Sequence, residues 1–163
     1  MAAGELAFFV PSDRPGMNGR RKPWYGLNDI IDNARRNRFG YRRQKDDAEA
    51  HVARFARRAM EEQGWEMPEG RCLVTLTFVE PHGQRDPDNI YGGAKYVMDA
   101  ICAPERVGRK RDGSPRYRHA NGAGCIRDDS QRYVDLRVAI CGEFDREAPG
   151  VWVRIRELPR ETP

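Results

Sequence analysis

The sequence predicts an α/β fold of the α+β kind, in which helices pack on a small mixed β-sheet. The chain has 163 residues, which is enough for one domain with a single hydrophobic core. Four runs rich in β-branched and aromatic residues are separated by segments whose apolar residues recur at helical spacing. We therefore expect one domain over residues 1–163 with the order β-α-β-α-β-β.

The N-terminal part of the chain predicts one strand and two helical segments. Residues 5–10 (E-L-A-F-F-V) form a short apolar run ended by Pro11, which is typical of a strand. Residues 27–32 predict the start of a helix, and the Arg-rich stretch after them gives no clear boundary. Residues 46–63 show apolar residues at helical spacing, and Gly64 is expected to stop that helix.

The middle of the chain predicts a buried strand followed by a short helix. Residues 71–79 (R-C-L-V-T-L-T-F-V) suit a central strand covered on both faces. Glu80 and His82 follow it and are secondary functional candidates, because catalytic groups often lie where a strand meets a loop. Asn89 is the expected helix N-cap, and the helix has apolar residues at positions 94, 97, 98 and 101.

Two features of this helix need an explanation. Gly92 and Gly93 cost roughly 2 kcal/mol relative to alanines inside a helix, so either the helix begins after them or the backbone bends there. Lys95 and Asp99 are four residues apart, and a structural ion pair and a functional lysine are both compatible with that spacing.

The C-terminal part predicts two strands. Apolar residues alternate with polar ones over residues 134–140 and again over residues 151–155. Residues 142–150 form the turn between them, so we expect an antiparallel hairpin.

Basic residues are concentrated between Arg14 and Arg43, on the helix that carries Arg54, Arg57 and Arg58, and between Arg106 and Arg118, although the net charge is only +4. Residues 12–25 combine arginines with Trp24 and Tyr25, which suits contact with phosphates and bases but also an irregular surface loop. The insertion at residues 103–124 has no apolar periodicity and is interpreted as a substrate-gripping arm, or alternatively as an ordinary hairpin. The candidate nucleic-acid-binding residues are Arg20, Arg21, Lys22, Arg85, Arg109, Lys110, Arg111, Arg116 and Arg118.

Two acidic clusters carry the strongest chemical signal. Asp86 and Asp88 stand two apart in R-D-P-D-N, and extended backbone there projects both carboxylates to one side. Asp128 and Asp129 lie some forty residues further on. We expect the two clusters to meet in space and to form an oxygen-ligand site for Mg²⁺, with Mn²⁺ as a substitute.

Cysteine usage and hydropathy indicate the state of the thiols and the cellular location of the protein. The four cysteines are scattered without a C-x-x-C pair, so reduced buried thiols are expected; His119 near Cys102 and Cys125 leaves a weaker zinc alternative open. There is no run of about 18 to 20 apolar residues and no signal-peptide pattern. A cytoplasmic protein with no membrane partner and no small-molecule cofactor is therefore expected.

The acidic clusters and their surroundings resemble the RusA family of Holliday junction resolvases. The similarity rests on residues 72–79, R-D-P-D-N-I, M-D-A-I, R-D-D-S-Q and V-D-L-R-V, and covers most of the chain after residue 45. It implies a homodimeric, Mg²⁺-dependent endonuclease of bacteria or their phages that makes paired nicks in four-way DNA junctions.

The resemblance also implies residue roles. Asp86, Asp88 and Asp129 correspond to the metal ligands, and Asp128 to an assisting carboxylate. The family lysine follows the second aspartate of D-x-D by four residues; Gly92 stands there, and Lys95 takes its place after an apparent three-residue insertion. Two alternatives remain: a catalytically weak DNA-binding phage or prophage accessory protein of the same fold, and an unrelated hydrolase or metal-binding module.

Overall fold

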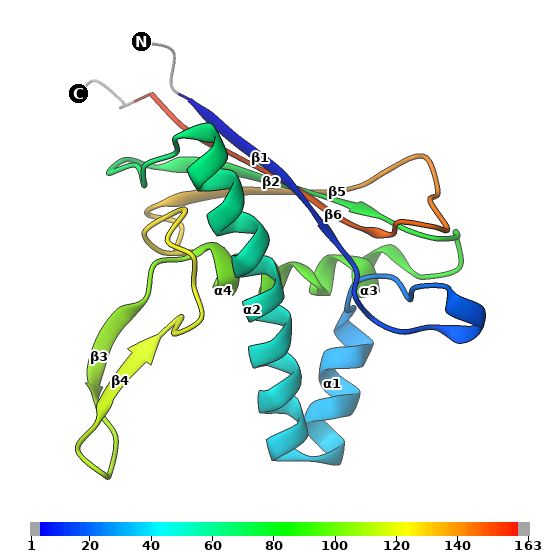
Figure 1. The fold of residues 1–163 in the computed structure, drawn as a ribbon, viewed down its shortest axis with the longest axis horizontal. Coiled ribbons are helices and arrows are strands. Elements are labelled where there is room, and N and C mark those ends of the chain that lie inside the picture. The colour runs from blue at the N-terminus through cyan, green and yellow to red at the C-terminus, as the bar shows by residue number, and fades with distance from the viewer. Residues whose placement is uncertain (1–3, 160–163) are drawn as a thin grey trace.

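The computed structural model describes residues 4–159, which form one mixed α+β domain (Figure 1). A four-stranded sheet has helices on one of its faces, and a separate two-stranded hairpin projects beside them. A 3-10 turn at Met17–Gly19 lies in the basic loop. The other elements are β1 (Glu5–Pro11), α1 (Leu27–Arg36), α2 (Arg38–Gln63), β2 (Cys72–Val79), α3 (Pro87–Gly92), α4 (Ala94–Ile101), β3 (Glu105–Arg109), β4 (Pro115–Arg118), β5 (Val134–Ile140) and β6 (Gly150–Glu157).

The sheet order is β1-β6-β2-β5, which corrects the predicted C-terminal hairpin. β6 pairs antiparallel with both β1 and β2, and β5 pairs parallel with β2. The connection from β2 to β5 contains two helices, as a parallel pair requires. β5 and β6 are strands as expected, but β2 lies between them because it offers both of them a buried partner.

The hydrophobic core lies between one face of the sheet and the helices. Alternate residues of β2 and β6 are fully buried, and the residues between them are partly or fully exposed. Helices α2, α3 and α4 lie on the same side of the sheet (Figure 1). The expectation that β2 is covered on both faces is therefore wrong: it is central in the sheet, but only one of its faces is fully buried.

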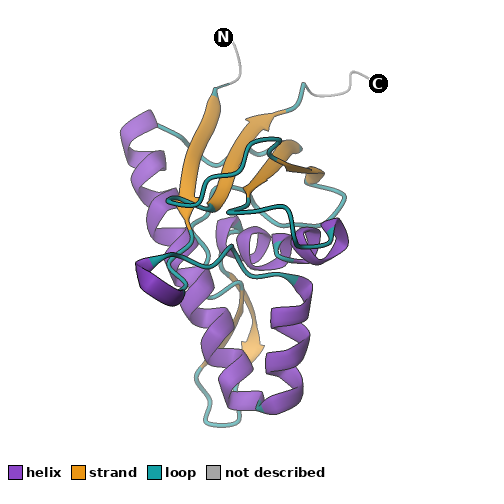
Figure 2. Ribbon diagram, turned by 90° about the vertical axis from the view of Figure 1, so that its right-hand side faces the viewer, coloured by secondary structure: helices purple, strands orange, loops and turns teal. Residues whose placement is uncertain are grey.

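Helix α2 is longer than its apolar pattern predicts. It begins after Asn37, whose side chain accepts a hydrogen bond from the Phe39 amide at 2.9 Å, and ends at Gly64 with a φ of 64°. Gly64 is thus confirmed as the stop. The N-terminal half of α2 packs against α1 away from the sheet (Figure 2), so it needs no apolar stripe toward the main core.

The glycine pair lies at the junction of α3 and α4, where other segments of the chain approach closely. A Cβ on Gly93 would overlap the Tyr25 carbonyl oxygen, and a Cβ on Gly92 would lie 2.5 Å from Leu27 Cβ. The buried Trp24 ring donates a hydrogen bond from Nε1 to the Gly93 oxygen at 3.1 Å. Both glycines therefore let the chain before α1 lie against the α3–α4 junction.

The N-terminus of α3 differs from the expectation at Asn89. The N-cap is Asp86, and Pro87 occupies the first helical turn, where a missing N–H costs little. The Asn89 Oδ1 instead accepts a hydrogen bond from the Asn28 amide at 2.9 Å. Asn89 therefore links α3 to α1 rather than capping its own helix.

The insertion at residues 103–124 is an antiparallel hairpin, which is the alternative interpretation given above. β3 and β4 pair with a register shift between Arg106 and Gly108. Every residue of both strands is exposed, so the hairpin has no hydrophobic periodicity to reveal it. It projects from the same side of the sheet as α1 and the N-terminal half of α2 (Figures 1 and 2).

We expect the protein to lose stability at alkaline pH because it contains buried thiols. Burial raises the pKa of Cys72 to about 11 and that of Cys125 to about 12. An unfolded thiol ionises near pH 9, so stability is complete below pH 9 and falls as the pH rises through 11 to 12. We expect a loss of about 1 kcal/mol per thiol at pH 10. Urea unfolding at pH 7.5 and 10 measures it, and a Cys125→Ala variant with an undiminished pH dependence would contradict it.

The structure contains, within residues 4–159, no helix with the length and hydropathy needed to cross a lipid bilayer.

Candidate metal centre

The end of α4, the end of the hairpin and the loop before β5 converge on one site. Backbone hydrogen bonds join Cys125 N–H to the Ile101 oxygen at 2.8 Å and Ala103 N–H to the Ile126 oxygen at 2.8 Å. The hairpin returns at His119, and the Ala123 amide donates to the Ala100 oxygen at 2.7 Å. Segments distant in sequence are thus fixed around the C-terminal end of α4.

Three metal-ligating side chains meet at this site. One ligand atom from each of Cys102, His119 and Asp129 lies within 4.8 Å of the other two. Over residues 4–159 this is the sole set of three or more His, Cys, Asp or Glu side chains that satisfies that limit. We call these three residues, together with Asp128, the His119 cluster.

His119 is central to the cluster. Its Nε2 lies 3.8 Å from Oδ1 of Asp128 and 3.8 Å from Oδ1 of Asp129. Its Nδ1 lies 3.6 Å from Oδ1 of Asp99 on α4. The backbone at His119 has a φ of 51°, an uncommon conformation for a residue other than glycine. The imidazole therefore lies between one buried carboxylate and two that are nearer to solvent.

Two lysines balance the buried Asp99. Lys95 Nζ lies 3.2 Å and Lys45 Nζ lies 3.4 Å from Asp99 Oδ2. The i,i+4 ion pair of Lys95 and Asp99 is therefore present. The Lys95 side chain remains 55% exposed, so its ammonium group is also accessible to a ligand near the cluster.

The two neighbouring aspartates differ in their affinity for a proton. Burial and a shared side-chain hydrogen bond with Asp128 raise the pKa of Asp129, although His119 opposes the rise. Burial acts in the same direction on Asp128, but hydrogen bonds from Asp129 and Ser130 outweigh it and lower the pKa of Asp128. The Asp129 amide donates to Asp128 Oδ1 at 2.8 Å. A divalent cation relieves the repulsion that otherwise keeps a proton on such a pair.

Asp86 and Asp88 lie elsewhere in the single chain. Both are exposed, at the N-cap and in the first turn of α3, which follows the C-terminal end of β2. Asp129 precedes β5, whose first residue, Val134, pairs with the first residue of β2. Because the strands are parallel, the two acidic clusters lie at opposite ends of this strand pair. Asp86 and Asp88 are not members of the His119 cluster, so the expected meeting of the clusters is not seen within one chain.

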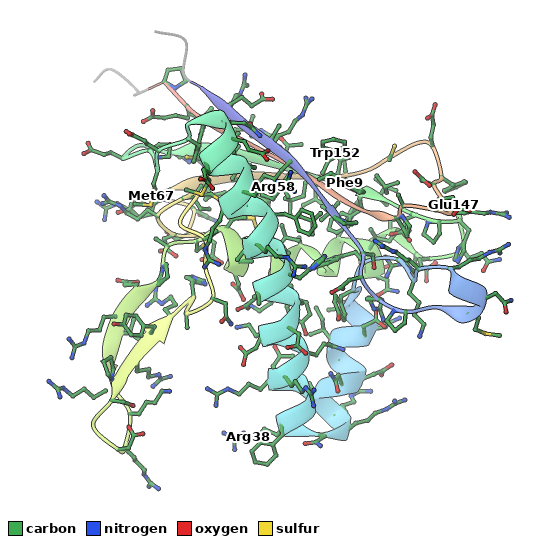
Figure 3. The ribbon with its side chains drawn as sticks, viewed as in Figure 1. Phe9, Arg38, Arg58, Met67, Glu147 and Trp152 are labelled. Carbon is green, nitrogen blue, oxygen red and sulfur yellow. The ribbon has the colours of Figure 1, made fainter. Side chains whose placement is uncertain are left out.

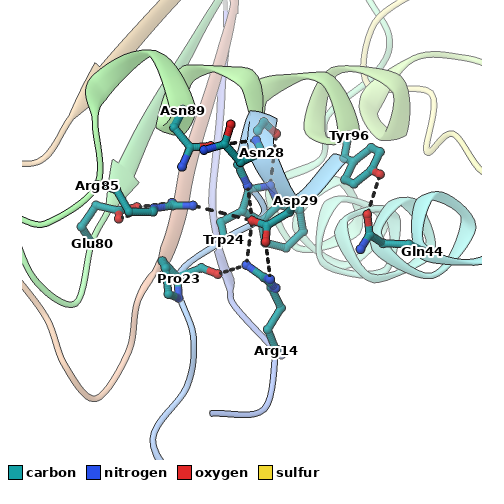
Figure 4. Close-up of polar contacts among 12 residues, drawn as sticks. Arg14, Pro23, Trp24, Asn28, Asp29, Gln44, Glu80, Arg85, Asn89 and Tyr96 are labelled. Carbon is teal, nitrogen blue, oxygen red and sulfur yellow. Dashed lines mark hydrogen bonds and ion pairs between the residues drawn. The ribbon is translucent and has the colours of Figure 1, made fainter. Parts of the chain in front are cut away.

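Structural ion pairs occupy the predicted residues near Asp86. Arg85 contacts Glu80 through two hydrogen bonds of 2.9 and 2.7 Å, and Glu80 is buried (Figure 4). Asp29 lies 3.9 Å from Arg85 and 3.0 Å from Arg14. Arg85 is only 13% exposed, so it differs from the exposed arginines predicted to contact nucleic acid. Glu80 and Arg85 thus hold the end of β2 to α1.

The other predicted basic residues are exposed. Arg20, Arg21 and Lys22 line a cavity of about 440 Å³ together with His82 and Arg146. The hairpin residues Arg109, Lys110, Arg111, Arg116 and Arg118 are all exposed on the strands or the tip. A third basic region lies around the α1–α2 turn, where Arg38 marks the distal end of α2 (Figure 3). The exposed members are Arg35, Arg36, Arg38, Arg42 and Arg43.

Two members of the site have no specific signal in the sequence. The sequence points to His119 only as a weak zinc ligand, and to Asp99 only as a partner of Lys95. One sequence signal could have linked Asp99 to the site. Asp99 stands three residues before Cys102, so both side chains lie on one face of the helix near the end of α4.

Comparisons with known proteins do not add to this description. No protein-family model, curated protein or solved structure matches the chain.

Proposed function

We propose that the protein is a divalent-metal-dependent endonuclease that acts on branched DNA, with four-way junctions as the substrate. The observation that carries the proposal is a metal-ligating cluster at the base of an exposed basic hairpin. The acidic motifs that resemble the RusA family support the same activity. Exposed arginines suit phosphate contacts, and the carboxylates supply ligands for the hydrolytic metal.

The chemistry follows from what surrounds the cluster. Asp129 would hold a cation, which would supply a bound water of lowered pKa and would offset the charge that develops on the scissile phosphate. Lys95 lies in the first turn of α4, and its ammonium group, 3.2 Å from Asp99, is a further positive charge near the centre that would serve that phosphate. Asp86 and Asp88 lie at the opposite end of the β2–β5 strand pair, so within one chain they are not ligands of this centre.

The test is cleavage of a synthetic four-way junction with Mg²⁺, Mn²⁺ or Zn²⁺, compared with linear duplex and with EDTA. We expect metal-dependent, symmetric nicks in the junction only. Binding without cleavage would instead favour the catalytically weak DNA-binding protein. Neither binding nor cleavage would contradict both proposals.

The basic hairpin is expected to raise DNA affinity mainly by neutralising phosphates. Replacing Arg109, Lys110 and Arg111 with alanine removes three exposed cations. The slope of log affinity against log salt should fall by up to roughly 0.9 for each phosphate that the hairpin no longer neutralises. Fluorescence anisotropy across a salt series measures it. The matched control replaces Arg137, Arg154 and Arg156, which are exposed on strands β5 and β6, and an equal reduction in both variants would contradict the role of the hairpin.

The proposed substrate also requires two active sites. A four-way junction is two-fold symmetric, so paired nicks need two centres in opposed orientation and we extend the proposal to a homodimer. Light scattering at assay concentrations should give the mass of two chains. The mass of one chain, in the presence and absence of junction, would contradict the dimer.

A further inference from the structure

We propose that Cys102 Sγ, His119 Nε2 and the Asp129 carboxylate form a site that takes Zn²⁺ in preference to Mg²⁺. This deepens the proposed function, because it names the metal of the same centre. Only the role of the zinc site in catalysis rests on the proposed nuclease function, because metal binding is measurable without DNA. Three observations carry it: an unpartnered imidazole nitrogen, a carboxylate behind the imidazole, and a thiol as the third donor.

The imidazole nitrogen that faces the carboxylates is buried without a hydrogen-bond partner. The His119 side chain is 9% exposed, and Nε2 makes no hydrogen bond. Its distance of 3.8 Å to each nearby aspartate oxygen is too long for one. A buried polar atom left in this state costs roughly 1–3 kcal/mol. A metal between Nε2 and Asp129 supplies the missing partner.

Asp99 has the position of a carboxylate that orients a metal-binding histidine. Its Oδ1 lies 3.6 Å from Nδ1 of His119, which is near the ring but longer than a hydrogen bond. A tautomer with its proton on Nδ1 would face this carboxylate and would leave the lone pair on Nε2, the atom that faces Asp128 and Asp129. Metal-binding histidines usually place their second nitrogen against such a group. Lys45 and Lys95 both lie within ion-pair distance of Asp99 Oδ2.

Cys102 makes the site different from an all-oxygen Mg²⁺ site. Its thiol is buried and donates to the Met98 oxygen at 3.1 Å. Metal binding replaces the thiol proton, which leaves to solvent, and forms a metal–sulfur bond. Tetrahedral ligands lie about 3.4 to 3.7 Å apart around Zn²⁺. His119 Nε2 and Asp129 Oδ1, now 3.8 Å apart, are close to this spacing, and atoms within the 4.8 Å limit need to close by at most about 1.4 Å.

The donor set decides the metal. Sulfur and imidazole suit Zn²⁺ and Co²⁺, whereas Mg²⁺ prefers oxygen ligands in an octahedron and keeps several waters. Three protein ligands also leave the fourth tetrahedral position open for water or Asp128, as in catalytic zinc sites. The Mg²⁺ expected from the carboxylate motifs would therefore bind this centre more weakly than Zn²⁺.

Cobalt titration of the metal-free full chain tests the inference. We expect one Co²⁺ per chain with a thiolate-to-cobalt charge-transfer band, displacement by Zn²⁺, and no displacement by Mg²⁺ in large excess. Cys102→Ser should remove the charge-transfer band, while Cys141→Ser, on a half-exposed thiol after β5, should retain it. Asp99→Asn should weaken Co²⁺ affinity about 10- to 100-fold, because the orienting carboxylate is removed. Circular dichroism checks that each variant is folded.

The outcomes separate this inference from the nuclease proposal. Absence of Co²⁺ binding by the folded wild-type chain, or a charge-transfer band that persists in Cys102→Ser, overturns the site. Displacement of Zn²⁺ by Mg²⁺ overturns the preference. Thiolate-bound Co²⁺ in a protein that does not cut junctions supports the zinc site and counts against the nuclease.

Discussion

Replacing Asp129 with asparagine should reduce cleavage of a four-way junction by at least about 100-fold. Asp129 belongs to both metal assignments: it is the aspartate of the second acidic cluster and a member of the His119 cluster. The substitution removes the ligand charge but keeps the shape of the side chain. The rate of nicking under single-turnover conditions measures the effect, and junction affinity in EDTA should stay within about threefold because the basic hairpin is unchanged.

Controls make this result specific. Asp47→Asn removes one exposed carboxylate from α2 and should cut at the wild-type rate, because Asp47 is outside the His119 cluster and its ion pair, at 3.9 Å, is with the exposed Arg43. Asp86→Asn and Asp88→Asn should match Asp129→Asn if all three hold the same metal. Loss of activity in Asp129→Asn alone would place the centre at His119 without them. Wild-type cleavage by Asp129→Asn contradicts the proposed metal centre.

Replacing Gly93 with alanine should destabilise the fold by about 3 kcal/mol or more. The new methyl group would collide with the Tyr25 carbonyl and lie 3.1 Å from Trp24 Cδ1. Backbone and a buried indole cannot yield without disturbing the hydrogen bond from Trp24 to the Gly93 oxygen. Overpacking a core commonly costs 1–3 kcal/mol, and a collision with backbone exceeds that range. The free energy of unfolding in urea measures the loss.

Gly142→Ala is the matched control for this prediction. A Cβ at Gly142 meets no atom within 4 Å, and its φ is not in the left-handed region. Its unfolding free energy should remain within about 1 kcal/mol of the wild type. If Gly93→Ala were equally mild, the close approach of the Trp24 segment to the α3–α4 junction would not contribute to stability.

The fold is predictable wherever burial imposes a period on the sequence. Strands β1, β2, β5 and β6 and the C-terminal half of α2 all pack on the core, and each is expected from its apolar pattern. The β3–β4 hairpin and the first turns of α2 lie outside the core, so their sequences are free of that period. Strand order is not predictable, because β2 offers paired edges to both β5 and β6 and local pattern does not choose between them.

The candidate site is predictable only in part. Motifs identify Asp128, Asp129 and the pair of Lys95 and Asp99, and the structure connects them through the contacts of Asp99 and His119. Membership of His119 and Cys102 depends on how the hairpin returns to α4, which is a long-range property. The separation of Asp86 from Asp129 depends on the parallel pairing of β2 with β5. The sequence offers His119 near Cys102 only as a weaker zinc alternative, and the separation of the two acidic clusters leaves no trace in residue spacing.

Anomalous diffraction from crystals soaked in Zn²⁺ tests the metal centre most directly. We expect one strong peak about 2.0 to 2.3 Å from His119 Nε2, Cys102 Sγ and an Asp129 oxygen. A peak between Asp86 and Asp88, with none beside His119, would contradict the assignment.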